Sequence, residues 1–293
     1  IVTNTVTGAG KSGGGIYAVS SVLTLTNCLI ATNSANGIYN SWGLGGGVCL
    51  ASGVLTIDTC RVTRNAAWGI ASGAPYPHGG GIWLGAGTTS TIVRTVVDGN
   101  LATARGGGIF SQGKMDLVNS LVVSNTTTAS GGAGGLYVTN AGSVMMLMNC
   151  TVANNSDPGL RRDDGTVGIT NCIFWNNGDD LTGTITVAYS DIQTVDSFWT
   201  VGINGCLTNN PLFVDATYYH EQSRIGNYTN GYFSGGGWGK SLSNSPCIDA
   251  GAANSPWSLE PAPSGRRANM GAYGNTPVAS LSAVMQGSMF MFR

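Results

Sequence analysis

The 293-residue sequence predicts an all-β solenoid, through a repeated glycine triplet, a repeated asparagine and short alternating runs between them. The triplets, each followed by an aliphatic residue, are Gly13–Gly15, Gly45–Gly47, Gly79–Gly81 and Gly106–Gly108, with a weaker copy at Gly134–Gly135. Measured between the last glycines, the steps are 32, 34, 27 and 27 residues. A variable period of this size is typical of a solenoid whose coils share a core but differ in loop length.

A second repeat, offset from the first, carries a small residue, a short apolar stretch and an asparagine. Its copies are residues 28–33, 60–65, 95–100, 120–125, 150–155 and 172–177. In stacked coils about 4.8 Å apart, like residues lie on like residues. We therefore expect the asparagines to bond to the coils above and below, as stacked amides do in cross-β ladders. The small residues that open the copies, such as Cys28 and Ser120, are expected to face the interior.

Short alternating runs rich in β-branched residues, such as Val22–Thr26, Val54–Asp58 and Met115–Val118, indicate strands of four to six residues. The sequence has no stretch with sustained helical periodicity. Two or three short strands per coil predict a single-stranded right-handed parallel β-helix. The glycine triplets suit the bends between its sheets, because glycine adopts backbone angles that are closed to other residues.

The composition fits this fold and excludes some functions. Glycine makes up 46 of the residues, and only 9% are charged, against about 25% in average proteins. The net charge of −1 argues against nucleic acid as a partner. No apolar run reaches the roughly 18 residues of a membrane span. Because the sequence starts without an initiator methionine or a signal peptide, we expect it to be a piece of a longer protein.

The seven cysteines are an odd number, and most fall on predicted strands, so we expect buried free thiols. Cys206 and Cys247 are the best candidates for a disulfide if one forms. No Cys/His cluster has metal-ligand spacing, so we expect no cofactor. Asp249 and Glu260 are the candidates for a calcium site, with turn capping by Asp249 as the alternative.

After about residue 190 the glycine repeat stops, and four segments follow. They are NPLFVD at 210–215, YYH at 218–220, SPCIDAG at 245–251 and NMGAYG at 269–274. This series resembles the closing region of bacterial secreted and cell-surface right-handed parallel β-helix repeat proteins. With the upstream repeats, the resemblance covers residues 1 to about 280. Asn210 and Tyr218 stand where the family has aspartate and Glu221 where it has leucine, so a role that those aspartates have in the family does not carry over to this sequence.

The resemblance supports a division into three parts. Residues 1–190 form the coils of the parallel β-helix, with an uncapped N-terminal end. Residues 191–280 form the last irregular coils and a non-repetitive C-terminal cap, whose prolines stop strand addition. Residues 281–293 form an apolar tail or linker.

The resemblance also implies an extracellular or cell-surface location and a structural or adhesin-like role. Some relatives of the fold are polysaccharide lyases, so an enzyme of this kind, or a glycoside hydrolase, is the alternative. A lyase needs a base beside acidic residues or calcium. The clusters at 161–164 and 179–180 are more typical of turns, and 13 basic residues provide no evident cationic groove. We therefore expect a non-enzymatic protein. An ice- or mineral-binding surface is a third possibility, but the threonines are irregularly spaced.

Aromatic and polar residues gather in the loops before the glycine triplets, and we expect them to emerge on one side of the solenoid. Aromatic faces with a few polar partners suit sugar rings, so these residues are the candidates for binding a surface glycan, and Tyr17 and Trp83 extend the same face. The alternative is a satellite cluster that packs over the loops. The candidates are Tyr39, Trp42, Trp68, Tyr76, His78 and Arg105.

The two ends of the chain are the candidates for self-assembly. The first coil opens mid-repeat, and the tail is unusually apolar. Strand addition between these segments would stack the protein end to end into a stalk or fibre. The alternative is a tail that packs along its own helix. The assembly candidates are Ile1, Val2, Met285, Met289, Phe290 and Phe292.

Overall fold

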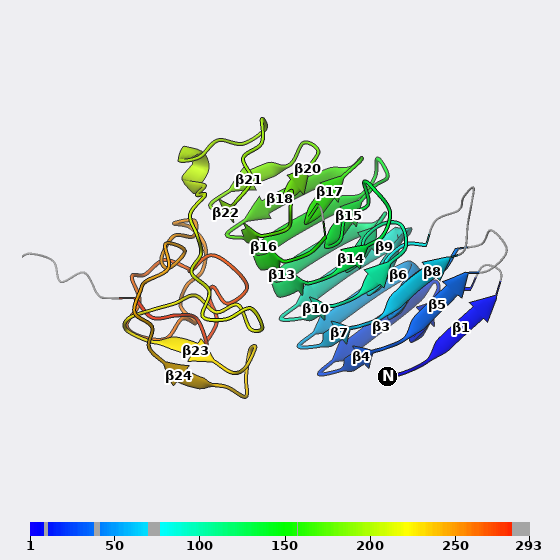
Figure 1. Cartoon of the computed structure of the whole chain (residues 1–293), viewed down its shortest axis with the longest axis horizontal. Helices are drawn as coiled ribbons and strands as arrows, with labels where there is room; N and C mark the ends of the chain where they lie inside the picture. Colours follow the sequence, from blue (N-terminus) through cyan, green and yellow to red (C-terminus); the bar gives the residue numbers. More distant parts are fainter. Residues whose placement is uncertain (9–10, 38–41, 70–76, 157, 283–293) are drawn as a thin grey trace, which may run out of the picture.

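The computed structural model describes residues 1–8, 11–37, 42–69, 77–156 and 158–282. They form a right-handed parallel β-helix, as predicted, with a C-terminal region beside it (Figure 1). All coil strands pair in parallel, and the only antiparallel pair of strands among the described residues is β23 with β24. The described helix content is one short 3-10 turn, η1 (Ile203–Gly205). No helix in these ranges is long and apolar enough to cross a membrane.

The chain turns from each glycine triplet into the first row of strands, which we call the triplet-side strands. These are β2 (Ile16–Ala18), the start of β6 (Val48–Asp58) and of β9 (Ile82–Val93), β12 (Ile109–Ser111), β15 (Leu136–Val138), β17 (Leu160–Arg162) and β20 (Leu181–Thr182). The next row contains β3 (Ser21–Thr26), the rest of β6 and β9, the start of β13 (Lys114–Val123) and of β16 (Val144–Ala153), β18 (Thr166–Thr170) and β21 (Thr186–Ala188).

A third row, the cap-side strands, faces the C-terminal region. It contains β4 (Leu29–Ala31), β7 (Arg61–Thr63), β10 (Val96–Asp98), the ends of β13 and β16, β19 (Ile173–Trp175) and β22 (Asp191–Ile192). A separate five-stranded sheet contains β1 (Thr5–Gly8), β5 (Ser34–Gly37), β8 (Ala66–Gly69), β11 (Leu101–Ala102) and β14 (Thr126–Thr127).

Among the described residues the coils have two or three strands, as predicted, except the coil of β2, β3, β4 and β5, which has four. The prediction did not include the separate five-stranded sheet. Its strands escape a sequence pattern because β5 and β8 consist of Ser, Ala, Asn, Gly and Trp, with no β-branched residue. These strands are stabilised by stacking rather than by residue type, since each pairs in register with the equivalent strand of the next coil, as Ala35 does with Ala67.

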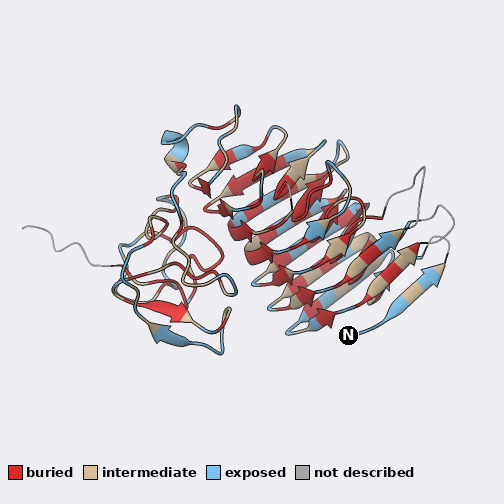
Figure 2. Cartoon of the chain, viewed as in Figure 1, coloured by how far each residue is buried: buried red, intermediate tan, exposed pale blue. Residues whose placement is uncertain are grey.

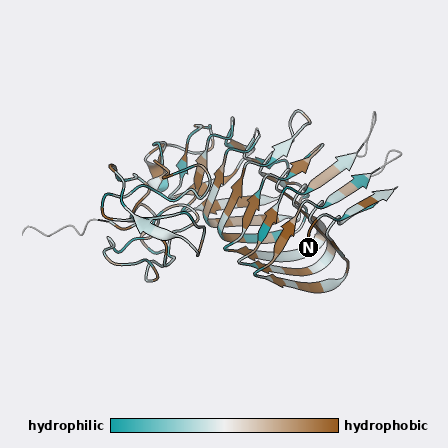
Figure 3. Ribbon diagram, turned by 60° about the horizontal axis from the view of Figure 1, so that its bottom comes forward, coloured by the Kyte–Doolittle hydropathy of each residue, from teal (hydrophilic) through white to brown (hydrophobic). Residues whose placement is uncertain are grey.

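The core runs along the axis of the stack. In each cap-side strand the middle residue points inward, and the side chains before and after it point outward. The inward residues Ile30, Val62, Val97, Val122, Val152, Phe174 and Ile192 are all fully buried. Figure 2 shows the strands of the middle coils largely buried and β1 largely exposed. Figure 3 shows apolar stretches recurring at equivalent places in successive coils.

The predicted asparagine ladder is confirmed. The Asn65 backbone N–H and its Nδ2 both donate to Oδ1 of Asn100, at 2.9 and 3.0 Å, and Nδ2 also donates to the Ile30 carbonyl at 2.9 Å. The same pattern joins Asn33, Asn65, Asn100, Asn125, Asn155 and Asn177. The ladder ends at Asp180, whose Oδ1 accepts from Nδ2 of Asn177 at 2.8 Å. Each coil is thereby tied to both neighbours through buried amides.

The small-residue ladder is confirmed too, and in several copies the backbone N–H donates to the side chain of the next coil. Examples are Cys28 to Sγ of Cys60 at 3.3 Å and Thr95 to Oγ of Ser120 at 3.1 Å. All seven cysteines lie within the described residues and are free thiols, so Cys206 and Cys247 are not bonded to each other. Cys206 belongs to the main core, whereas the Cys247 thiol donates to Oδ2 of Asp191 at 3.1 Å.

The C-terminal region does more than follow the last coil. Trp199, only 6% exposed, packs into the end of the main core. The chain then folds back beside the cap-side strands, carrying β23 (Asn227–Thr229) and β24 (Gly237–Gly239) (Figure 1). Its side chains Tyr219, Tyr228, Tyr273 and Val278 form a second core with the outward residues Val96, Leu121, Val123 and Ala153. The region therefore covers one side of the solenoid.

Candidate functional site

A groove of about 380 Å³ lies where the first coils emerge from beneath the C-terminal region. One wall is made by the cap-side strands β4, β7 and β10 and the turns before them, and the other by the loop 232–234. We call it the cap-side groove. The residues that matter for its chemistry are Arg61, Arg94, Tyr232 and Phe233.

The repeat itself places the two arginines in this groove. Arg61 opens β7 and points outward, because the next residue, Val62, points into the core. Arg94 lies in the turn before β10 with a left-handed φ of 45°, at the position that Asn27 and Thr59 take in the preceding coils. Tyr232 and Phe233 come from the C-terminal region and pack against the second core.

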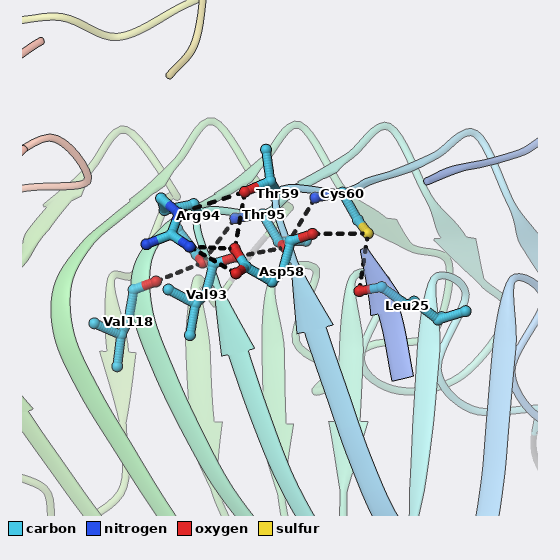
Figure 4. Close-up of polar contacts among 9 residues, drawn as sticks. Leu25, Asp58, Thr59, Cys60, Val93, Arg94, Thr95 and Val118 are labelled. Carbon is cyan, nitrogen blue, oxygen red and sulfur yellow. Dashed lines mark hydrogen bonds and ion pairs between the residues drawn. The ribbon is translucent and has the colours of Figure 1, made fainter. Parts of the chain in front are cut away.

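Both arginines are paired with carboxylates. Arg61 donates from Nε and Nη2 to the two oxygens of Asp98 at 3.0 and 2.8 Å. Arg94 Nη2 donates to both oxygens of Asp58 at 2.7 and 2.6 Å, where strand β6 ends (Figure 4). The hydrogen bond to Asp98 raises the pKa of Arg61 above its ordinary value. The groove is thus lined by two arginines whose charges are largely cancelled by Asp58 and Asp98, which are not among its lining residues.

The Arg61 guanidinium also lies over the ring of Tyr232, 5.4 Å from its centroid. An arginine held between a carboxylate and an aromatic face has little freedom to move. Sequence reasoning missed this site because its two walls are about 170 positions apart in the chain. The wall on the cap-side strands could have been predicted, because Arg61 and Arg94 stand directly beside members of the small-residue ladder in the sequence.

The loops before the glycine triplets form a different cluster. The Trp42 and His78 rings meet edge to face at 5.8 Å, and His78 stacks on Phe110 at 4.4 Å. Phe110 in turn stacks on Tyr137 at 5.4 Å. His78 is only 6% exposed, which corrects the expectation that it emerges from its loop. Burial lowers its pKa to about 3, with a smaller contribution from the charge of Arg105.

The remaining glycan candidates are dispersed. Arg105 lies over the Tyr137 ring, 5.1 Å from its centroid, beside a hollow of about 210 Å³. Trp68 is 45% exposed on β8 of the five-stranded sheet. Tyr39 and Tyr76 lie outside the described residues. The structure thus brings Trp42, His78 and Arg105 together, with His78 buried and Trp42 43% exposed.

The assembly candidates Ile1 and Val2 are half exposed, and their backbone pairs with β4. The Ala31 N–H donates to the Ile1 carbonyl at 3.0 Å, and the Thr3 N–H donates to the Ala31 carbonyl at 3.0 Å. Met285, Met289, Phe290 and Phe292 lie outside the described residues.

The calcium candidates bind backbone groups. Oδ1 of Asp249 accepts the Gly265 N–H at 3.0 Å, and Oε1 of Glu260 accepts the N–H groups of Asn269 and Asn275 at 2.7 and 2.8 Å. These bonds fit the turn-capping alternative, and calcium binding stays a prediction. In the ranges that the structure describes, no group of three or more His, Cys, Asp or Glu side chains is arranged to hold a metal ion.

The protein is therefore a solenoid with a C-terminal region packed along one side, and the cap-side groove lies between the two. Comparison with known families assigns this solenoid to one of them. The sequence model of the family described as "Right handed beta helix region" matches residues 46–211, more than half of the chain. The chain therefore belongs to the right-handed β-helix family. No curated protein and no solved structure matches it.

Proposed function

We propose that this protein is a non-enzymatic, extracellular, adhesin-like β-helix that binds a neutral glycan in the cap-side groove. The observation that carries the proposal is that Arg61 and Arg94, each paired with a carboxylate, line one groove together with Tyr232 and Phe233. The family membership supports the solenoid scaffold alone; ligand, location and role are our inference.

The composition of the groove favours a sugar without charge. Aromatic rings pack against the apolar faces of a sugar, and Arg61 and Arg94 supply donors for its hydroxyl groups. Asp98 and Asp58 already neutralise the arginines, so an anionic polysaccharide would gain little from them. The proposal therefore moves the glycan site from the loops before the glycine triplets to the groove beside the cap-side strands.

The same pairs argue against a lyase at this position. An arginine that acts as a base must lose its proton, and the hydrogen bond to Asp98 raises the pKa of Arg61. A general base works best with a pKa near the operating pH. The groove is therefore suited to binding rather than to proton abstraction.

The test is a glycan-array screen followed by calorimetry with the best neutral oligosaccharide. We expect Arg94→Gln to weaken binding at least about tenfold, because it removes the guanidinium donors from the groove. The variant should fold as the parent does, since Arg94 is half exposed and its loss leaves no buried group unpaired. Trp68→Ala, on the five-stranded sheet, is the matched control and should bind as the parent does. Loss of binding in the Trp68 variant alone would return the site to the aromatic loops. Release of shortened or unsaturated sugars would refute a non-enzymatic role.

Self-association is a second proposal, supported by the exposed edge of the first coil. Val22 on β3 is 81% exposed, and Asn4 at this end of the amide ladder is exposed as well. Another coil could pair with this edge through the same ladder. Electron microscopy of concentrated protein should show end-to-end rods that Val22→Lys abolishes. Single particles at every concentration would contradict it.

A further inference from the structure

A second cavity, of about 270 Å³, lies at the other end of the cap-side sheet. Strands β16 and β19 form its floor, and the segment 210–219 of the C-terminal region forms its other wall. Three aromatic residues, Trp175, Phe213 and Tyr219, line it together with Asp215. Phe213 and Tyr219 meet edge to face at 5.2 Å. We call this cavity the aromatic pocket.

Most hydrogen-bonding groups of the other polar side chains in the pocket are already occupied. Nδ2 of Asn154 donates to the Tyr219 hydroxyl at 2.6 Å, and Oδ1 of Asn154 accepts from Asn176 at 2.5 Å. Oδ1 of Asn210 accepts the Leu212 N–H at 2.9 Å. A sugar in this pocket would therefore compete with internal hydrogen bonds. A ligand that needs few hydrogen bonds fits better.

The electrostatics of the pocket favour a cation. Oδ1 of Asp215 accepts the N–H groups of Thr217 and Tyr218 at 2.8 and 2.7 Å, which fixes the carboxylate at the rim. None of the described residues that line the pocket is Lys, Arg or His. Aromatic faces and a carboxylate both attract positive charge.

We propose that the aromatic pocket binds a methylated ammonium group, such as the headgroup of choline. Such a group carries its charge on an apolar surface and donates no strong hydrogen bonds, so it matches three rings and one carboxylate. Pockets for drug-sized ligands hold about 300–1,000 Å³, and 270 Å³ suits a smaller headgroup. The site is separate from the cap-side groove, and it stands whether or not that groove binds a glycan.

The test uses choline and its uncharged carbon isostere, 3,3-dimethyl-1-butanol, in calorimetric titrations at constant ionic strength. We expect choline to bind at least about tenfold more tightly than the isostere. Asp215→Asn keeps the Oδ1 acceptor but removes the charge, so it should weaken choline binding at least about tenfold and leave the isostere unchanged. Trp175→Leu should weaken choline binding likewise. Trp238→Leu, at a half-exposed tryptophan on β24, is the matched control.

Equal affinity for choline and the isostere would overturn the proposal, because it would show a merely apolar pocket. No choline binding by the parent protein would overturn it too, as would displacement of choline by a neutral sugar. Near-ultraviolet circular dichroism of each variant checks the fold. If the Trp175 variant fails to fold, the Asp215 variant and the isostere comparison still decide the question.

Discussion

Replacing Asn100 by alanine tests the amide ladder at its centre. Asn100 is 1% exposed, and its side chain bonds to the coil on each side. The substitution leaves the Asn65 N–H without its 2.9 Å acceptor and the Val62 carbonyl without its 2.9 Å donor. A buried polar group that loses its partner costs about 1–3 kcal/mol. We therefore expect the free energy of unfolding to fall by about 2–6 kcal/mol.

Asn4→Ala is the matched control at the exposed end of the same ladder. Oδ1 of Asn33 keeps the Asn4 backbone N–H at 3.0 Å, so no buried group is orphaned. Surface changes of this kind stay within about 0.5 kcal/mol. Guanidinium titrations followed by tryptophan fluorescence and circular dichroism give both values, and coincident curves would justify a two-state treatment of a repeat protein. A change below about 0.5 kcal/mol for Asn100→Ala would refute the reasoning.

Two further predictions concern the glycine triplets and the buried acid Glu221. Gly107→Ala should lower the melting temperature by several degrees, because a Cβ there would lie 2.4 Å from the Thr126 carbonyl oxygen. Gly142→Ala should leave the melting temperature unchanged, since nothing lies within 4 Å of a Cβ at that position. Equal melting temperatures for the two variants would contradict this. Burial, with a smaller contribution from Glu260, raises the pKa of Glu221 from 4.5 to about 8. The folded state therefore holds a proton that the unfolded chain releases, and stability should fall as pH rises from about 4.5 to about 8. Glu221→Gln should flatten this dependence in denaturation measured across that range, and an unchanged slope would count against it.

The coils could be predicted because their residues repeat. The asparagine position carries the same residue in every copy and the small-residue position only Cys, Ser or Thr, so the two ladders mark which side chains stack. The stacking of Asn65 on Asn100 follows from sequence spacing alone. The five-stranded sheet could not be predicted, because β8 owes its strand pairing to the neighbouring coils rather than to its residues. The cap-side groove was missed for a related reason. Arg61 meets Tyr232 only after the C-terminal region folds back along the solenoid, and no local pattern encodes that contact.

Glu221 shows what the contact between the C-terminal region and the side of the solenoid requires. The resemblance places leucine there, and the structure buries Glu221 completely, with neither carboxyl oxygen bonded to a described residue. Oε1 lies 3.0 Å from where a Cβ of Gly271 would be, a point also 2.8 Å from the Ile173 side chain and 3.0 Å from Oγ1 of Thr151. The carboxyl therefore lies at the junction of the C-terminal region with β16 and β19. A charge there would have no counter-ion, so the protonated acid takes the place of the leucine. Because β16 and β19 also form the floor of the aromatic pocket, we expect conditions that ionise Glu221 to loosen this pocket.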